Sequence, residues 1–526
     1  MTVSVRKQTF IQGAMILLAA GLVNRLLGFV PRIALPRLIG AEGVGLIQLV
    51  FPFLIVLLTV ITGGLPLAVA KMVAEADSRG RSGEARKVLR IAMSIALAVS
   101  VTAAVACLVL ADWISSSVMT DARVHLAFLA IIPVLPLVAV SSVWRGYFQG
   151  KQNMIPTAIS QTVETIVRIV LTLTLAYLLL PYGLEAAAAG AMIGTGAGEL
   201  AGLLVLWTQV RREPSGRSET AGDGSDAGQA DAAASRKLSR GLLGLALPVT
   251  GSRMIGSLSY LLESILTTRS LVLAGLTGAA ATAQYGALQG MAIPLILLPG
   301  TLTFSLATSL VPSLSEAAAK NDWAAIQKRL HQSMRLAVVT GAPFVVLMAL
   351  FADPLCAMLY NDASVGTMLG WLAPVAVFLY MQAPLQAALQ ALNRPGTALF
   401  NTFAGAMVKL VLIIQLASRP ELGIKGAVIA ISVNMALVTL LHWISVARLT
   451  GFRLLPTDFL KVGAAMIVMG AVALWIWNQD LLPGQAFDLT AASLAAIVVY
   501  LLILIAFKLI DRHDVARVPI LGRLFR

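Results

Sequence analysis

The sequence predicts an all-α membrane protein with many spans, and three observations support that fold class. Of its 526 residues, 58% are hydrophobic and only 12% are charged, whereas soluble domains carry about 25% charged residues. The mean hydropathy is +0.86. Apolar windows of the ~20 residues needed to cross a bilayer recur along the whole chain. We therefore expect a polytopic protein built from helices, because helices and closed barrels alone satisfy the backbone in lipid.

Fourteen windows are long and apolar enough to cross a membrane. The first follows an N-terminus that resembles a signal peptide, but its apolar run continues beyond Gly21 without a clean cleavage site, so we interpret it as a retained span. The fourteen candidates lie at 10–32, 44–70, 88–111, 124–143, 156–180, 185–208, 241–268, 282–310, 333–352, 365–390, 397–417, 424–447, 458–477 and 488–510.

Basic residues are concentrated in alternate loops. The net charge is +14, and clusters of cations follow spans 2 and 6, whereas the opposite loops are poorer in cations and contain aspartates. By the positive-inside rule, both termini are expected in the cytoplasm. Because this distribution explains the basic composition, we expect no nucleic-acid partner. The cations assigned to the cytoplasmic side include Lys71, Arg79, Arg86, Arg211, Arg236, Lys328 and Arg512.

A polar segment divides the chain into two similar halves. Residues 213–236 are rich in Gly, Ser, Ala and Asp, which is typical of a flexible linker. At an offset of 241 positions, Arg168 falls on Lys409. We expect two parallel six-helix repeats related by an axis along the membrane normal. The expected organisation is an N-lobe at 1–212, a cytoplasmic linker at 213–236, a C-lobe at 237–453, two extra C-terminal helices within 454–510 and a cytoplasmic tail at 511–526.

The first span carries cations at membrane depth. Arg25 and Arg32 are seven positions apart and share one helical face with Gly28, and Pro31 offers a bend between them. An arginine in the bilayer costs at least ~2.5–3.5 kcal/mol on insertion scales, so it should face a wet cavity or a partner. For Arg32, extension to the interface is the alternative. We expect the chain to enclose a central cationic cavity around this helix.

Further charges lie in spans 5, 6, 7 and 11. Glu164 and Arg168 are four positions apart and can pair, and such a pair could serve folding alone. Their repeat counterpart Lys409 has no carboxylate at the matching position, so it needs another partner. Besides Arg25 and Arg32, the candidate cavity cations that would bind substrate are Arg168, Arg253, Arg269 and Lys409. Glu164, Glu199 and Glu263 are candidate sodium or proton coupling sites, or partners of the arginines.

Span 6 also carries a stripe of small residues, with glycines four positions apart at 190, 194, 198 and 202. Such a stripe predicts close packing against a neighbouring helix. The four histidines of the chain have no metal-ligand spacing and form no arrangement of nucleophile and base. We expect no catalytic residue, no metal site, no bound cofactor and no enzyme activity.

Two motifs resemble a known family. The run GLVNRLLGFVPRIALPRLIGAEGVG in the first span and the run WRGYFQGKQNMIP before span 5 are similar to the stage V sporulation protein B family. That family belongs to the multidrug/oligosaccharidyl-lipid/polysaccharide exporter superfamily, beside the MurJ lipid II flippases. The resemblance implies two lobes in a V around a cavity. It also implies flipping of an undecaprenyl-diphosphate-linked sugar precursor, lipid II for cell wall or spore cortex synthesis.

The resemblance further implies roles for particular residues and partners. Arg25 and Arg32 match the cavity cations of the first span, Arg253 or Arg269 is a weaker match in the second half, and at Lys409 only a cation is carried over. The last two spans would form a groove for the lipid tail. Expected partners are the lipid-linked diphosphate sugar, membrane lipids and, as candidates, peptidoglycan synthases.

Other functions stay open at this point. One is export of another polyprenyl-linked glycan, which the sequence does not distinguish from lipid II. A cation-coupled multidrug exporter would prefer an acidic and aromatic cavity. A membrane scaffold for peptidoglycan synthases would not need buried arginines, and a glycosyltransferase would need an acidic metal site in a loop. The sequence also leaves open whether sodium, protons or the membrane potential drives transport.

Overall fold

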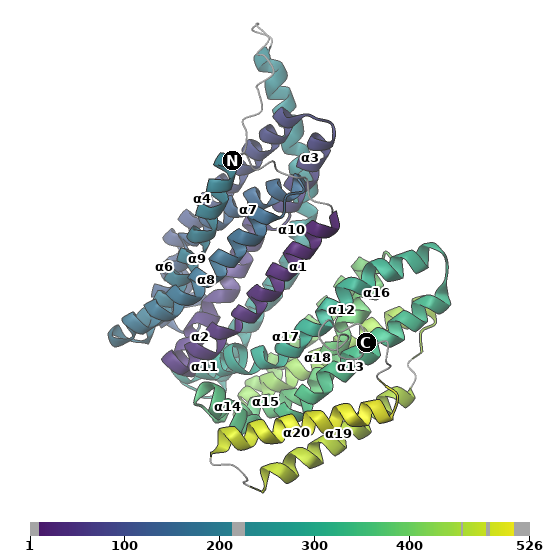
Figure 1. The fold of residues 1–526 in the computed structure, drawn as a ribbon. Helices are drawn as coiled ribbons and strands as arrows, with labels where there is room; N and C mark the ends of the chain where they lie inside the picture. The colour runs from purple at the N-terminus through teal and green to yellow at the C-terminus, as the bar shows by residue number, and fades with distance from the viewer. Residues whose placement is uncertain (1–9, 213–226, 454–455, 480–483, 510–526) are drawn as a thin grey trace. The chain divides into compact units, whose positions relative to one another are not determined.

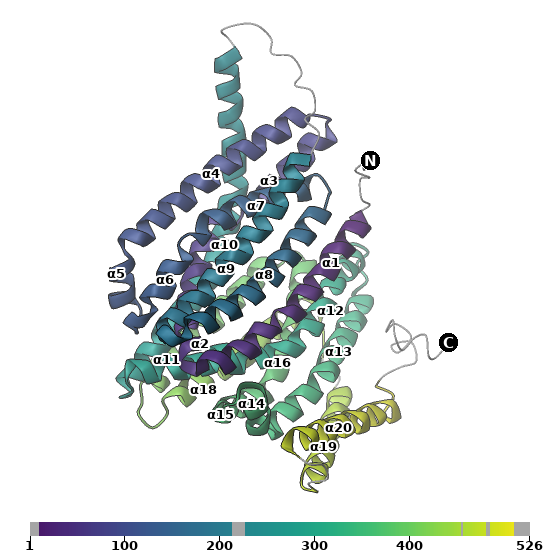
Figure 2. The ribbon, with the colours of Figure 1, turned by 60° about the vertical axis from the view of Figure 1, so that its left-hand side comes forward.

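The computed structural model describes residues 10–212, 227–453, 456–479 and 484–509. The expected tail at 511–526 and most of the expected linker lie outside these residues. All regular elements among the described residues are helices (Figures 1 and 2). Within these described ranges, twelve helical stretches are long and apolar enough to cross a membrane. This confirms an all-α membrane protein, while the count of fourteen spans stays a prediction.

The chain divides into two compact units, Met1–Gly290 and Met291–Arg526. The helices of the first unit are α1 (Phe10–Leu27), α2 (Phe29–Thr62), α3 (Leu65–Ser78), α4 (Ser82–Val109), α5 (Ala111–Trp113), η1 (Ile114–Val118), η2 (Ala122–Val124), α6 (His125–Ile131), α7 (Val134–Gly150), α8 (Ile155–Leu179), η3 (Leu180–Tyr182), α9 (Leu184–Arg212), α10 (Ala227–Leu273) and α11 (Gly278–Gly286). The division falls within η4 (Ala287–Ala292).

The second unit is also entirely helical over its described residues. Its helices are α12 (Ile293–Ala319), α13 (Trp323–Leu350), α14 (Ala352–Tyr360), α15 (Ser364–Leu372), η5 (Ala373–Val375), α16 (Ala376–Ala391), α17 (Pro395–Leu412), η6 (Ile413–Ala417), α18 (Ile424–Thr450), α19 (Pro456–Trp477) and α20 (Gln485–Ala506).

The first two expected spans are joined without a loop. Helical structure runs from α1 into α2 with a one-residue interruption at Gly28, and the chain reverses inside α2 at Gly40, whose φ is +68°. Only glycine adopts such a backbone conformation without a steric penalty. The gap expected between residues 32 and 44 is therefore a single glycine turn, which sequence periodicity does not reveal.

Two prolines interrupt expected spans. Pro133 lies between α6 and α7, and Pro374 lies in η5 between α15 and α16. Proline has no amide hydrogen to donate and its ring clashes with the preceding turn. Each of these two expected spans is therefore two helical segments.

The glycine stripe of α9 packs closely against α8, as the four-residue spacing predicts. A Cβ atom added at Gly198 would lie 2.7 Å from the Cβ atom of Arg168. One added at Gly190 would lie 2.7 Å from the carbonyl oxygen of Leu175. Both ribbon views show α8 and α9 side by side (Figures 1 and 2). Since the glycines carry no side chain, the two backbones approach each other and bring the charges of α8 close to α9.

In the second unit, α19 and α20 pack against α13 and complete one hydrophobic core. Tyr500 of α20 is fully buried and donates a hydrogen bond to the carbonyl oxygen of Val339 on α13 over 3.0 Å. Asp458 of α19 accepts a hydrogen bond from His331 of α13 at 3.0 Å. The two helices expected outside the repeats are thus an integral part of this unit.

Helix bounds in the two units follow the repeat seen in the sequence. Helix α4 comprises Ser82–Val109 and α13 comprises Trp323–Leu350, so both ends are displaced by 241 positions. Helix α7 ends at Gly150 and α16 at Ala391, with the same displacement. The repeat is therefore present in the secondary structure as well as in the residues.

The compact units do not coincide with the expected lobes. Helix α10 packs on α2 and α3 of the first unit, where Thr250 accepts a hydrogen bond from the amide of Gly64 at 3.0 Å. Helix α10 also begins at Ala227, so the last residues of the expected linker are helical. The compact units are defined by contacts within the structure, whereas the expected lobes are defined by the sequence repeat. The lobe boundaries at 212 and 237 therefore stay a prediction.

Candidate functional site

A cavity of about 450 Å³ lies within the first unit. It is lined by α1 and α2 on one side and by α8 and α9 on the other, with Gly290 at its end. Arg25, Arg32 and Arg168 all line it. None of the described lining residues carries a carboxylate. Arg25 and Arg32 therefore add positive charge to this space, and Arg168 adds a guanidinium that is also paired with Glu164.

The local sequence explains how the cations of the first span reach this cavity. Arg25, Gly28 and Arg32 fall on one helical face, and all three line the space. Gly28 keeps a helical hydrogen bond, from its amide to the carbonyl oxygen of Asn24 over 2.9 Å. The interruption at Gly28 therefore does not rotate Arg32 away from Arg25. The guanidinium of Arg32 also lies over the ring of Phe29, at 5.7 Å from the ring centre.

Arg168 connects the cavity to a buried ion cluster formed by α7, α8 and α9. The pair of Glu164 and Arg168, expected from their spacing, is present, and the side chain of Glu164 is 7% exposed. Arg145 of α7 donates to the other oxygen of Glu164 over 2.6 Å. Glu199 of α9 lies 3.8 Å from Arg168 and accepts a hydrogen bond from Ser141 at 3.3 Å. Two arginines and two glutamates thus share one largely buried site.

The ion cluster has no counterpart in the second repeat. At the offset of 241, its four charged positions become Gln386, Gly405, Lys409 and Leu440. Lys409 lies on α17 and is half-buried. One cation is therefore kept, while both carboxylates and one arginine are absent from those positions. The two units consequently differ in electrostatics although they share helix bounds.

The two candidate arginines of α10 make main-chain contacts away from this cavity. Arg253 donates to the carbonyl oxygen of Gly63 at the end of α2 over 2.7 Å. Arg269 donates to the carbonyl oxygens of Ser117 and Val118 over 2.5 and 3.2 Å. Among the described residues that line the cavity, neither arginine is present. These hydrogen bonds fasten the middle and the C-terminal end of α10 to other elements of the first unit.

Glu263, the remaining candidate, is buried on α10 and accepts a hydrogen bond from Gln289 at 2.9 Å. Within the described ranges, no group of three or more His, Cys, Asp or Glu side chains could hold a metal ion. Sequence reasoning missed Arg145. The signal was its place in the WRGYFQG motif, but its partner Glu164 is 19 positions away, so no helical spacing connects the two.

Comparison with known proteins identifies the family. A family model described as "Polysaccharide biosynthesis protein" matches residues 10–318, and the "MatE" model matches residues 257–414. "Stage V sporulation protein B" of Bacillus subtilis (strain 168) is 40% identical over 98% of this chain and 99% of its own. The chain belongs to the stage V sporulation protein B family. The expectation from the two motifs is thereby confirmed.

Members of this family have more distant relatives within the same superfamily. "Lipid II flippase MurJ" of the same organism is 25% identical over 88% of the chain and 86% of its own length. A solved structure of "Lipid II flippase MurJ, inward closed conformation" covers 94% of the chain and 99% of its own at a TM-score of 0.69 and 14% identity. A multidrug resistance MATE family transporter, inward-facing, covers 83% and 98% at a TM-score of 0.67 and 15% identity.

These findings establish the class of protein. The chain is a multi-pass membrane protein with the fold shared by MurJ and the MATE transporters. It is a member of the flippase and transporter superfamily and not an enzyme.

Proposed function

We propose that this protein is a flippase that moves an undecaprenyl-diphosphate-linked peptidoglycan precursor, lipid II, across the cytoplasmic membrane by alternating access. The supporting observation is the cavity of about 450 Å³ lined by Arg25, Arg32 and Arg168 without a carboxylate among its described lining residues. Guanidinium groups bind phosphate oxygens through paired, charge-assisted hydrogen bonds. A diphosphate matches this charge and chemistry.

The name of one relative supports this substrate. MurJ carries the name of a lipid II flippase, and the relative at 40% identity is named as a sporulation protein. We therefore assign the glycan to peptidoglycan, for general cell wall or spore cortex synthesis. Lys409 would add a cation from the second repeat, and the helices α19 and α20 would hold the polyprenyl tail in a groove while the headgroup crosses.

The ion cluster gives the cavity a means to respond to its substrate. Arg168 both lines the cavity and pairs with Glu164, and its side chain is 37% exposed. A diphosphate in the cavity would compete with the two glutamates for this guanidinium. Glu164 would keep Arg145 as its partner, whereas Glu199 would lose its contact with Arg168 and retain Ser141. Glu199 is thus the carboxylate at which proton or sodium uptake would accompany transport.

The direction of transport follows from charge. With both termini in the cytoplasm, as the loop charges predict, the substrate moves from the inner to the outer leaflet. An inside-negative potential favours that movement of an anion by ~2.3 kcal/mol per charge per 100 mV. The membrane potential can therefore drive flipping by itself, and a proton or sodium ion bound at Glu199 would add a second driving force.

Two alternatives use the same fold. Another polyprenyl-linked glycan would satisfy the cavity equally, because its diphosphate is the same. A multidrug exporter is the function named for the MATE structure, but the three cavity arginines would repel a cationic drug. The charge of the cavity therefore distinguishes the proposed flippase from a multidrug exporter. The identity of the transported sugar distinguishes it from an exporter of another polyprenyl-linked glycan.

The test is headgroup flipping of lipid II in proteoliposomes under an imposed potential. We expect wild-type protein to flip lipid II and Arg25→Ala to reduce the rate about tenfold or more, the size expected for a charge-assisted hydrogen bond. The matched control is Arg90→Ala, which removes an exposed cation of α4 in the same unit. Its rate should equal that of the wild type.

Three results would contradict parts of the proposal. An unchanged rate in folded Arg25→Ala would remove the cavity from the mechanism. Equal losses in Arg25→Ala and Arg90→Ala would indicate a general effect of net charge. Flipping of a different undecaprenyl-diphosphate glycan, with none for lipid II, would reassign the substrate and keep the mechanism.

A further inference from the structure

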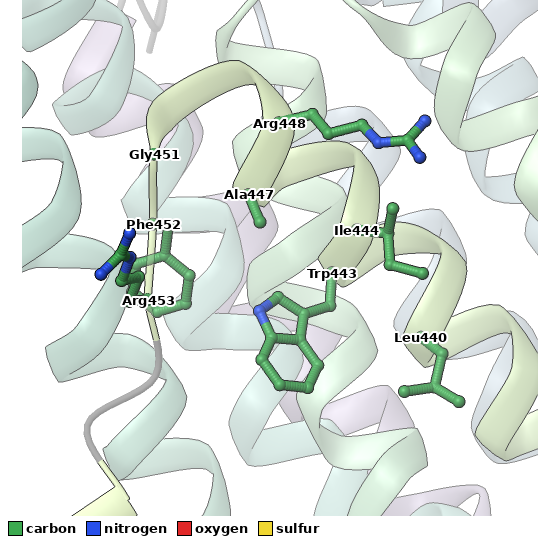
Figure 3. Close-up of a pocket in the computed structure, with 8 residues that line it drawn as sticks. All are labelled: Leu440, Trp443, Ile444, Ala447, Arg448, Gly451, Phe452 and Arg453. Atoms are coloured by element: carbon green, nitrogen blue, oxygen red, sulfur yellow. The ribbon is translucent and has the colours of Figure 1, made fainter.

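A second hollow lies in the other unit, at the C-terminal end of α18, with a volume of about 690 Å³ (Figure 3). Its floor is apolar and is formed by Leu440, Trp443 and Ile444, while Arg448 and Arg453 lie at its rim. It is separate from the arginine-lined cavity of the first unit. Nothing in the proposed flipping mechanism uses it.

The helical spacing orders these side chains along one stripe. Leu440, Ile444 and Arg448 follow one another at intervals of four residues, so they stand one above the other on the helix surface. Leu440 is 41% exposed and Ile444 is 46% exposed. On a membrane-spanning helix such exposed apolar side chains face lipid. The stripe therefore runs from hydrocarbon contacts to a cation at the helix end.

The rim is held by an ordered turn. Gly451 has a φ of +66° and its amide donates to the carbonyl oxygen of Ala447 over 2.8 Å, which ends the helix. Gln327 of α13 donates to the carbonyl oxygen of Thr450 over 2.7 Å, and Phe452 is buried. The chain beyond the helix is thus fixed, and Arg453 is kept at the rim on the side opposite Arg448 (Figure 3).

Among the described residues, no ion pair neutralises the charge of this rim. Within the part of the chain that the structure describes, Arg448 and Arg453 have no ion pair, whereas Arg335 of the same unit pairs with Asp458. Figure 3 shows the indole of Trp443 between the two arginines. Tryptophan prefers the boundary between hydrocarbon and headgroups, so the hollow lies at that level of the membrane.

We propose that this hollow binds an anionic glycerophospholipid of the surrounding bilayer. One acyl chain lies along Leu440 and Ile444, and the phosphate accepts hydrogen bonds from Arg448 at the end of the same stripe. Arg453 adds positive charge from the other side of the hollow, and the indole of Trp443 packs against the glycerol region. Selection of an anionic lipid requires both the apolar floor and the arginines of the rim. A zwitterionic lipid could pack its acyl chain on the floor but would not bring a net negative charge to the arginines.

Quenching of Trp443 fluorescence by lipids with brominated acyl chains tests this site. Full-length protein is placed in phosphatidylcholine vesicles that contain either brominated phosphatidylglycerol or brominated phosphatidylcholine. The signal of Trp443 is the difference between the protein and its Trp443→Phe variant. We expect about a fivefold preference for the anionic lipid, which corresponds to the ~1 kcal/mol typical of one cation near a membrane surface.

The following variants distinguish a specific lipid-binding site from a general effect of positive surface charge. Arg448→Gln should strongly reduce the preference, with Arg453 as the remaining cation, and Arg448→Lys should retain most of it. Arg394→Gln is the matched control, because Arg394 is an exposed arginine at the same end of this unit that does not line the hollow. It should leave the preference unchanged. Equal quenching by both lipids in the wild type, or an equal loss in Arg448→Gln and Arg394→Gln, would overturn the proposal.

Discussion

Arg145 on α7 donates a hydrogen bond of 2.6 Å to Glu164 on α8, and the side chains are 16% and 7% exposed. This contact joins two helices and fixes the carboxylate that also pairs with Arg168 of the cavity. Glu164 is buried, has two arginine partners and contacts the cavity through Arg168. The contact therefore links the stability of the first unit to the charge available for substrate.

Breaking this pair should destabilise the protein strongly. Arg145→Gln leaves a buried carboxylate with one partner fewer, and removal of one member of a buried pair costs about 3–5 kcal/mol. The measurement is thermal unfolding of the protein in nanodiscs. Arg81→Gln, which removes an exposed pair with Glu84, should cost less than about 1 kcal/mol. The double variant Arg145→Gln with Glu164→Gln should recover part of the loss, and failure to recover would show that the pair is not the cause.

The glycine stripe should tolerate no side chain where α9 touches α8. Gly198→Ala places a methyl group against Arg168, and overpacking of this kind costs about 1–3 kcal/mol. Gly256→Ala on α10 is the control, because no atom lies within 4 Å of the added Cβ. Melting temperatures of the two variants should differ by several degrees. Equal melting temperatures would mean that α8 and α9 can move apart to accommodate the methyl group without loss of folding free energy.

The two arginines of the first span should act together on a diphosphate. Arg25→Gln and Arg32→Gln should each weaken binding of undecaprenyl diphosphate about tenfold, as expected for one charge-assisted hydrogen bond. The double variant should lose less than the product of the two, because both line one cavity. Calorimetric titration in detergent measures these affinities. Arg37 lies on α2, as Arg32 does, but outside the described lining of the cavity, so Arg37→Gln should bind as the wild type does.

Stability at acid pH should depend on Asp121. Burial raises the pKa of this carboxyl, but hydrogen bonds from Arg123 and Thr282 outweigh burial, so the pKa lies below its ordinary value. A depressed pKa contributes stability above the unfolded value of about 3.9, and this stability is lost as the pH falls through the folded value. Asp121→Asn should therefore lower the melting temperature at pH 7 and make it less dependent on pH between about 5 and 3.

The control for this pH dependence is Asp112→Asn, since the side chain of Asp112 is 98% exposed. That variant should keep the melting temperature of the wild type at pH 7 and its decline in acid. A parallel decline of Asp121→Asn and the wild type would show that other carboxylates dominate acid unfolding.

Much of the fold was predictable because its causes are local. Hydrophobic windows predicted the helices from α8 to α9 and from α17 to α20 to within a few residues. Helical spacing predicted the pair of Glu164 and Arg168, and it placed Arg25 and Arg32 on one face. These properties depend on a period of 3.6 residues that every helix shares, so the sequence contains them directly.

Other features depend on which helices pack together. Arg145 reaches Glu164 only because α7 lies against α8, and Arg253 finds its acceptor 190 positions away in the chain. The one-residue turn at Gly40 and the grouping of α10 with the first unit have the same origin. The sequence by itself determined the class, the repeat and the local charge pairs, since these follow from hydropathy and helical period. Only the tertiary structure decided which arginines line one cavity and which fasten a helix end, because that depends on distances between elements far apart in the chain.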